Sequence, residues 1–145
     1  MLNFFQSIFI LILRLYWGWQ FFQAGLGKLS HIQKPIQFFT DLGIPLPTFN
    51  AYLVGSIEMI GGLLLLVGFF ARLVSIPLIV VLLTALFTAH AEATFNLFRD
   101  PDTFFEQAPF LFLYASWVVL LFGPGQFSLD HLFHNFFLSK KEKIV

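Results

Sequence analysis

The sequence contains no cysteine and little charge. Only 11% of its 145 residues are Asp, Glu, Lys or Arg, whereas a soluble domain carries about 25% charged residues. The absence of cysteine excludes disulfides, iron–sulfur clusters, thiolate nucleophiles and dithiol relays within the chain. The formal net charge is zero, which argues against nucleic acid as a partner. With so few charges, lipid is expected to cover much of the surface.

Several catalytic signatures are missing as well. The chain has no Gly-rich phosphate loop, no nucleophile elbow and no haem-type pair of histidines within its apolar runs. A self-contained hydrolase, kinase or cytochrome is therefore not expected, and the sequence assigns no catalytic residue and no metal ligand. The first apolar run lacks the basic leader and the cleavage site of a secretion signal, so we interpret it as a retained span.

Long apolar runs dominate what is present. The chain is 58% hydrophobic, and its apolar runs cover about residues 3–24, 49–70, 73–89 and 108–122. They predict an all-α integral membrane protein in which residues 1–145 form one domain, an antiparallel bundle of four transmembrane helices. The last two runs are near the lower limit of about 17 residues for an upright membrane helix.

A shorter segment between the first two runs is expected to lie in the membrane interface. Ile32, Ile36 and Phe39 recur at i, i+4 and i+7 with polar residues between them. This spacing predicts a short amphipathic helix over His31–Leu42 that covers one end of the bundle. The segment of residues 92–107, between the third and fourth runs, is acidic and is expected to be an aqueous loop.

The C-terminal tail, residues 128–145, is aromatic and ends in lysines, and we predict that it lies at the membrane surface. Ser128 or Asp130 is the expected N-cap of a short helix there. The lysines favour a cytoplasmic location for both termini. His131 and His134, spaced i and i+3, permit a metal site but suit interfacial side chains better.

Arg14 and Glu58 differ from their surroundings because each lies inside an apolar run. At about 1.5 Å per residue, Arg14 lies roughly 16 Å and Glu58 roughly 14 Å from the start of its run. In a hydrocarbon core of about 30 Å, both fall near the midplane. An ionisable group there is costly unless it is paired or hydrated. We therefore expect the two residues to form an ion pair, which either fixes the helix register or serves a ligand.

Small residues share the faces of these two charged residues. On the first run they are Gly18 and Gly25, and on the second run they are Ala51, Gly55 and Gly62. Small residues spaced by four allow two helices to approach closely. We therefore predict that the two faces pack against each other.

Lys28 and His90 are the other candidate binding residues. Lys28 lies on the Arg14 face, about 20 Å farther along the helix, where it either joins a site or extends to the interface. His90 ends the third run, and with nearby polar residues it forms either a metal or proton-entry site or a solvated rim. These polar residues are His31, Glu92, Asp100, Asp102 and Glu106.

An aromatic cluster in the first run has two interpretations. Aromatic rings with amide partners are able to line a quinone-like pocket, but they also form aromatic belts at membrane surfaces. The residues are Tyr16, Trp17, Trp19, Gln20 and Gln23.

Taken together, the motifs resemble the DoxX family over about residues 10 to 131. The matching motifs are Arg14-Leu-x-x-Gly18, Gly25-Leu-Gly-Lys28, Leu42-Gly43-Ile-Pro45, Glu58-x-x-Gly61-Gly62, Arg72 and Gly123-Pro124-Gly125-x-x-Ser128-Leu129-Asp130. The resemblance implies a small four-helix protein of the bacterial inner membrane, linked to membrane oxidoreductase assemblies. Relatives include a thiosulfate:quinone oxidoreductase subunit and a partner of thiol-stress and superoxide-defence proteins. The missing cysteines exclude a thiol-based role for this chain, and no residue matches a thiosulfate site.

Three functions are compatible with the sequence. The first is a membrane subunit of a redox complex that binds a quinone or a small anion at the Arg14–Glu58 site. The second is a permease or proton-coupled transporter for a small solute, with the ion pair as its gate. The third is a non-catalytic scaffold for a soluble enzyme. The expected partners are membrane lipid, a redox protein and a second copy of the chain.

Overall fold

The computed structural model describes residues 4–132 and 136, and over these residues the chain forms helices and no strand. The long helices are α1 (Phe4–Ser30), α3 (Pro47–Val67), α4 (Ala71–Phe87) and α7 (Ala108–Phe122). The short helices are α2 (Gln33–Asp41), α5 (Ala91–Phe95) and α6 (Pro101–Phe105). The expected all-α class is therefore confirmed for this part of the chain.

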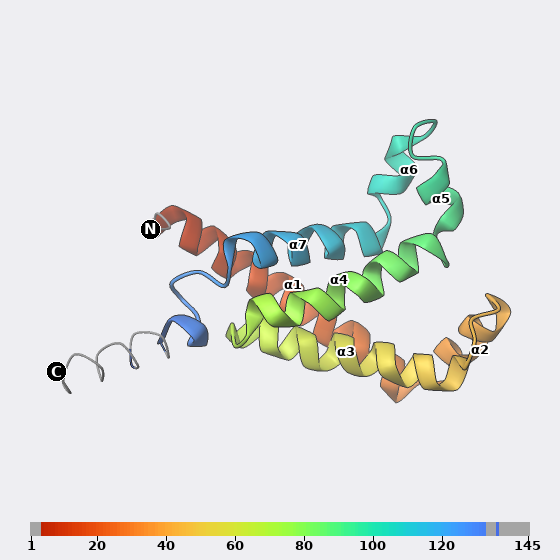
Figure 1. Cartoon of the computed structure of the whole chain (residues 1–145), viewed down its shortest axis with the longest axis horizontal. Helices are drawn as coiled ribbons and strands as arrows, with labels where there is room; N and C mark the ends of the chain where they lie inside the picture. Colours follow the sequence, from red (N-terminus) through yellow and green to blue (C-terminus); the bar gives the residue numbers. More distant parts are fainter. Residues whose placement is uncertain (1–3, 133–135, 137–145) are drawn as a thin grey trace.

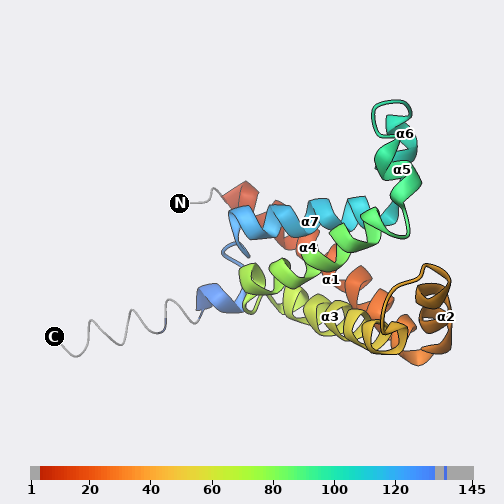
Figure 2. The same cartoon turned by 45° about the vertical axis from the view of Figure 1, so that its right-hand side comes forward.

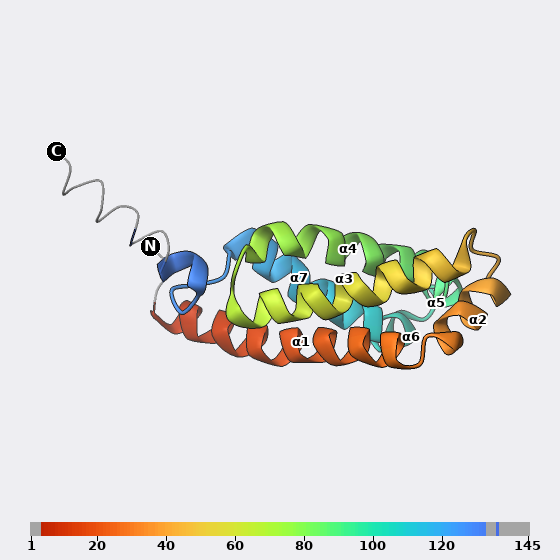
Figure 3. The ribbon, with the colours of Figure 1, turned by 90° about the horizontal axis from the view of Figure 1, so that it is seen from below.

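The long helices lie side by side along the long axis of the molecule (Figures 1 and 3). α1 packs mainly on α3, and α4 packs mainly on α7. We call the end formed by residues 68–70 and 123–130 the closed end. The opposite end, formed by residues 31–46 and 88–107, carries α2, α5 and α6 and is called the open end (Figure 1).

Each predicted apolar run corresponds to one long helix, but α1 continues to Ser30, beyond the expected limit at Ala24. By length and composition, α3 is the one helix in the described residues that is long and apolar enough to cross a membrane. α4 and α7 are apolar but have only 17 and 15 residues. The four-span topology therefore stays a prediction.

Glycine ends α3 and allows a tight turn into α4. Gly68 has a φ of 70°, in the left-handed region. Its N–H donates to Leu64 O at 2.9 Å, and the N–H of Phe69 donates to the same oxygen at 3.0 Å. These bonds satisfy carbonyl groups that the end of a helix leaves free. The chain then reverses at once, which makes α3 and α4 the expected hairpin.

Small residues set the distance between α1 and α3. A Cβ atom on Gly25 would overlap the backbone nitrogen of Met59, and a Cβ atom on Gly62 would lie 2.7 Å from Gly18 O. Since real Cβ atoms do not approach so closely, a larger residue would push the helices apart. The predicted packing residues all lie on the buried faces of α1 and α3: Gly18, Gly25, Ala51, Gly55 and Gly62.

The outward faces of the long helices are apolar. Large hydrophobic side chains are exposed on every one of them, as with Phe5 on α1, Ile60 on α3, Leu73 on α4 and Leu121 on α7. Away from their ends, these helices carry two charged residues, Arg14 and Glu58. Both are buried, with exposed fractions of 1% and 6%. A soluble monomer rarely exposes such a continuous apolar surface.

Both connections at the open end are helical. The helix predicted over His31–Leu42 is confirmed as α2, with Ile36 and Phe39 half-buried. The segment of residues 92–107, expected to be a loop, instead contains α5 and α6, which project sideways from the bundle (Figure 2). α6 forms because Asp100 accepts a hydrogen bond from the N–H of Thr103 and caps the helix start.

Candidate functional site

Arg14 binds four backbone carbonyl oxygens at the closed end. Its Nε donates to Leu65 O and its Nη2 donates to Leu66 O, each at 3.0 Å. Its Nη1 donates to Pro124 O at 2.6 Å and to Phe127 O at 3.0 Å. Carbonyl groups in the last turn of a helix carry partial negative charge, which suits a cation. Arg14 therefore joins the end of α3 to the segment that follows α7.

The predicted ion pair between Arg14 and Glu58 is wrong, and the helix register explains the error. Gly18 lies against Gly62 on α3. Arg14, one turn earlier on the antiparallel helix, therefore lies at the level of Leu65, about 10 Å along the axis beyond Glu58. The expected pairing required the two antiparallel apolar runs to begin and end at the same depth. Instead, α1 extends past the end of α3 at the closed end.

Charged side chains also stabilise the other helix ends at the closed end. The carboxylate of Asp130 accepts hydrogen bonds from the N–H groups of Phe70 and Ala71, at 2.8 and 3.1 Å, at the start of α4. Arg72 donates to Leu121 O, at 3.5 Å, near the end of α7. In both cases the charge is opposite to the partial charge of the helix terminus.

Ser128 and Asp130, the two predicted N-caps of the tail, cap different helices. Ser128 Oγ accepts a hydrogen bond from the N–H of His131 and caps the helical turn that begins at residue 129. Asp130 caps α4 instead. His134 and most of the predicted interfacial tail, residues 128–145, lie outside the described residues. The closed end is therefore a set of structural contacts, in which Arg14 is central.

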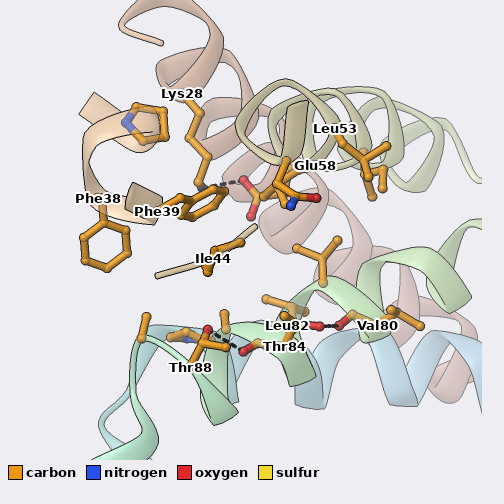
Figure 4. A pocket seen from close by; sticks show the side chains of 18 of the residues that line it. Lys28, Phe38, Phe39, Ile44, Leu53, Glu58, Val80, Leu82, Thr84 and Thr88 are labelled. Atoms are coloured by element: carbon orange, nitrogen blue, oxygen red, sulfur yellow. Dashed lines mark hydrogen bonds and ion pairs between the residues drawn. The ribbon is translucent and has the colours of Figure 1, made fainter. Parts of the chain in front are cut away.

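Glu58 pairs with Lys28, not with Arg14. The Nζ atom of Lys28 lies 2.5 Å from Glu58 Oε2 (Figure 4). A lysine near the end of a helix usually extends its ammonium group toward water, but Lys28 turns back into the bundle. The Glu58 side chain is 8% exposed and the Lys28 side chain 33%. An ammonium group has three donors and a carboxylate has two oxygens, so the pair is able to bind further polar atoms.

The ion pair lies in the wall of an apolar cavity of about 580 Å³ between α2, α3 and α4 (Figure 4). This volume falls in the range of about 300–1,000 Å³ that is typical of small-molecule sites. The apolar wall includes Phe38, Phe39, Leu53, Ile57 and Val80. The polar groups besides the pair are Asn50, Thr84, Thr88 and His90.

His90 connects the apolar cavity with a second, polar cavity of about 570 Å³ beside α5 and α6. Both cavities are lined by Ala89 and His90. Glu92 and Asp100, grouped with His90 in the sequence, line the polar cavity as well. The other three grouped residues, His31, Asp102 and Glu106, line neither of these two cavities. Among residues 4–132 and 136, no three His, Asp or Glu side chains are placed to hold a metal ion.

The aromatic cluster of α1 does not line the apolar cavity. Tyr16 and Trp19 are exposed on the outer surface. Trp17 packs against the ring of Phe112 on α7, with ring centroids 4.9 Å apart. The cluster therefore takes no part in the apolar cavity, and its interpretation as an aromatic belt stays a prediction. Of the predicted binding residues, the structure brings together Lys28, Glu58 and His90 and places Arg14 elsewhere.

Comparison with known proteins identifies a family and two relatives of this chain. Residues 9–91, which include both members of the Lys28–Glu58 pair, match the family model DoxX. The Bacillus subtilis protein named "Putative oxidoreductase CatD" is 39% identical over 85 residues, which are 59% of this chain and 62% of that protein, so the match spans less than two thirds of CatD. An uncharacterized Haemophilus influenzae protein is 27% identical over 141 residues, covering 93% of this chain and 89% of its own. No solved structure matches the chain.

Proposed function

The chain belongs to the DoxX family, and from this premise we propose that it is a membrane-embedded component of a redox system whose apolar cavity binds a quinone-type ligand. The name of the CatD relative supports the redox role. One observation carries the ligand assignment: a mostly apolar cavity of about 580 Å³ has the Lys28–Glu58 ion pair in its wall.

The chemistry of this wall suits a neutral ring with polar oxygens. The Lys28 ammonium donates a hydrogen bond to a quinone carbonyl, and the Glu58 carboxylate accepts one from a quinol hydroxyl. Phe38 and Phe39 offer aromatic surface to the ring. A small anion fits less well, because Glu58 already offsets the positive charge of Lys28. We therefore favour a quinone over an anion.

We further infer that α1, α3, α4 and α7 cross the bacterial inner membrane. Their outward faces are apolar, and both charged residues in their central parts are buried. A helix satisfies its own backbone hydrogen bonds, as a lipid environment requires. α4 and α7, at about 25 and 22 Å, are shorter than a hydrocarbon core of about 30 Å. The bilayer is expected to thin locally beside them.

The lysines of the tail favour a cytoplasmic closed end with both chain termini on that side. The chain has no cysteine, so single cysteines at Asp102 and Lys141 report the topology without background. A membrane-impermeant thiol reagent applied to intact cells is expected to modify position 102 and not position 141. Modification of both positions from outside would mean that α7 does not cross the membrane, so the four-span topology would be wrong, and modification of 141 alone would invert the orientation.

The ligand assignment is tested with decylubiquinone and the purified protein in lipid nanodiscs. The variant with Lys28→Gln and Glu58→Gln together removes the pair without leaving a single charge buried. We expect it to fold and to bind decylubiquinone at least tenfold more weakly than the unmodified chain. Lys34→Gln, on the exposed side of α2, is the matched control and should bind normally. Equal binding by the double variant, or no binding by the unmodified chain, would reject the assignment.

One observation favours the alternative of a permease. Ala89 and His90 line both cavities, so a polar solute in the polar cavity lies next to the apolar one. A permease would have to open the closed end, where Arg14 joins α3 to the segment after α7. Solute uptake into proteoliposomes that contain this protein alone would support the permease and count against a subunit role.

A further inference from the structure

We propose that the apolar cavity opens sideways to the membrane between α3 and α4 and admits a membrane-dissolved amphiphile with a polar head and one apolar tail. The head binds at Lys28 and Glu58, and the tail leaves past Val80 and Leu53 into the lipid. This inference rests on the proposed function for the membrane setting. It adds the chemical class of the ligand and its route of entry.

Side chains that line the cavity also form part of the outer surface. Val80 lies at the middle of α4 and is 58% exposed, and Leu53 on α3 is 43% exposed, yet both belong to the cavity wall. A wall residue with this much exposure marks an opening. Because Val80 is the tenth of the 17 residues of α4, the opening extends from the open end onto the flank of the bundle.

The rim of this opening is mainly apolar, and the two exposed threonines of the α4 wall, Thr84 and Thr88, donate their hydroxyl groups to backbone oxygens of their own helix. Leu53, Val80 and the exposed ring of Phe38 surround it, while the ion pair lies deeper, with Glu58 almost fully buried. A hydrated solute would lose hydrogen bonds to water as it passed such a rim. An alkyl or prenyl chain loses none. The opening therefore favours a ligand that arrives from lipid.

α2 covers the cavity at the open end, through Pro35, Phe38 and Phe39. None of the residues of α2 is fully buried, so it rests on the bundle without being embedded in it. The cavity wall on α4 extends from Pro77 to Thr88, about 16 Å along the helix. This length exceeds that of a single ring and accommodates the first part of a tail. Figure 4 shows the ion pair on one side of the cavity and the α4 wall, from Val80 to Thr88, on the other.

A pair of variants on α4 separates tail binding from head binding. Val80→Trp places a large ring in the opening, whereas Ile76→Trp makes the same change on the outer surface of the same helix, outside the cavity. We compare decylubiquinone with the tail-less ubiquinone-0 in nanodiscs. In the unmodified chain and in Ile76→Trp, the tail should improve affinity at least tenfold. In Val80→Trp this gain should disappear, while ubiquinone-0 binds as before. An equal gain in all three proteins would overturn the inference.

A photoreactive fatty acid with 16 carbons and a diazirine on its tail tests the opening without any quinone. Crosslinks should concentrate on residues 77–88 and 53–57, and Val80→Trp should remove them while Ile76→Trp retains them. Crosslinks spread evenly over all outward helix faces would overturn the inference. If the fatty acid labels the opening and decylubiquinone does not bind, the sideways opening stands and the quinone function fails. If decylubiquinone binds but Val80→Trp changes neither readout, the function stands and the opening fails.

Discussion

Lys28 turns back from the last turn of α1 and binds Glu58 in the middle of α3, at 2.5 Å. The ammonium group is thereby held inside the bundle at the level where Gly25 and Gly55 pack against each other. The pair joins α1 and α3, the same two helices that meet closely at Gly18, Gly25, Gly55 and Gly62, which we call the glycine seam. It therefore fixes the register of α1 on α3 and, at the same time, supplies the charged part of the cavity wall.

Breaking this pair should destabilise the protein more than removing both charges. Glu58→Gln or Lys28→Gln alone leaves one charge in an apolar wall. A fully buried pair costs about 3–5 kcal/mol to break, and we expect about 2 kcal/mol here because one third of Lys28 is exposed. The unfolding midpoint in detergent should fall in both single variants and recover in part when the two are combined. Single variants as stable as the unmodified chain would show that the pair contributes nothing to the fold.

The sequence identified the residues of this pair but not their pairing. Lys28 and Arg14 lie on one face of α1, and the sequence pattern pairs Arg14 with Glu58 and places Lys28 either in a site or at the interface. Which of the two cations reaches Glu58 depends on the register of α1 along α3, and hydropathy does not determine that register. The missing fact was this register, in which Gly18 lies against Gly62 and Gly25 lies against Gly55. It brings Lys28 to Glu58 and Arg14 to the carbonyl groups at the end of α3.

The glycine seam predicts opposite effects for two neighbouring glycines. In Gly25→Ala the new methyl group would overlap the Met59 backbone, so α1 and α3 must separate, at a cost of about 1–3 kcal/mol. A Cβ atom on Gly27 meets nothing within 4 Å. Gly27→Ala should therefore raise stability by up to about 1 kcal/mol through helix propensity. Unfolding midpoints of the two variants in one detergent test this. A midpoint for Gly25→Ala at or above that of the unmodified chain would refute close packing at Gly25.

Asp130 should be required for the start of α4. Its carboxylate accepts hydrogen bonds from two N–H groups, those of Phe70 and Ala71, which have no other cap in the structure. Asp130→Ala should cost about 1 kcal/mol, as the loss of an N-cap does, and increase hydrogen exchange in residues 70–75. Asp102→Ala, on the exposed first turn of α6, serves as the control. Unchanged exchange in Asp130→Ala would mean that water replaces the carboxylate without loss.

Periodicity and hydropathy predicted the helices better than they predicted the apolar cavity between the helices. The Ile32, Ile36 and Phe39 stripe was sufficient for α2, because its apolar side must be covered. The cavity was not predicted, although Val80, Thr84 and Thr88 recur at intervals of four on one face of α4. The two threonines do not by themselves indicate a cavity, since each donates its hydroxyl group to a backbone oxygen of its own helix. Only the position of α2 and α3 distinguishes a cavity wall from a lipid-facing surface.

Arg14 should stabilise the closed end independently of Glu58. Arg14→Met keeps an apolar side chain of similar length but removes all four hydrogen bonds to carbonyl oxygens. Pro124 O and Phe127 O would then lose their bonds to the guanidinium, so hydrogen exchange in residues 125–130 should rise at least tenfold. Arg14→Lys should retain part of the protection, because an ammonium group still donates to some of these oxygens.

Reversing the two charges tests the register of α1 and α3 directly. Arg14→Glu places a carboxylate among four carbonyl oxygens, and Glu58→Arg places a second cation beside Lys28. Since Arg14 and Glu58 lie at levels about 10 Å apart, neither change compensates the other. The double reversal should therefore give a folded yield no higher than the worse single variant. A yield above both single variants would mean that the two residues meet, and that α1 packs on α3 in the register that the sequence suggested and not in the one that places Gly18 against Gly62.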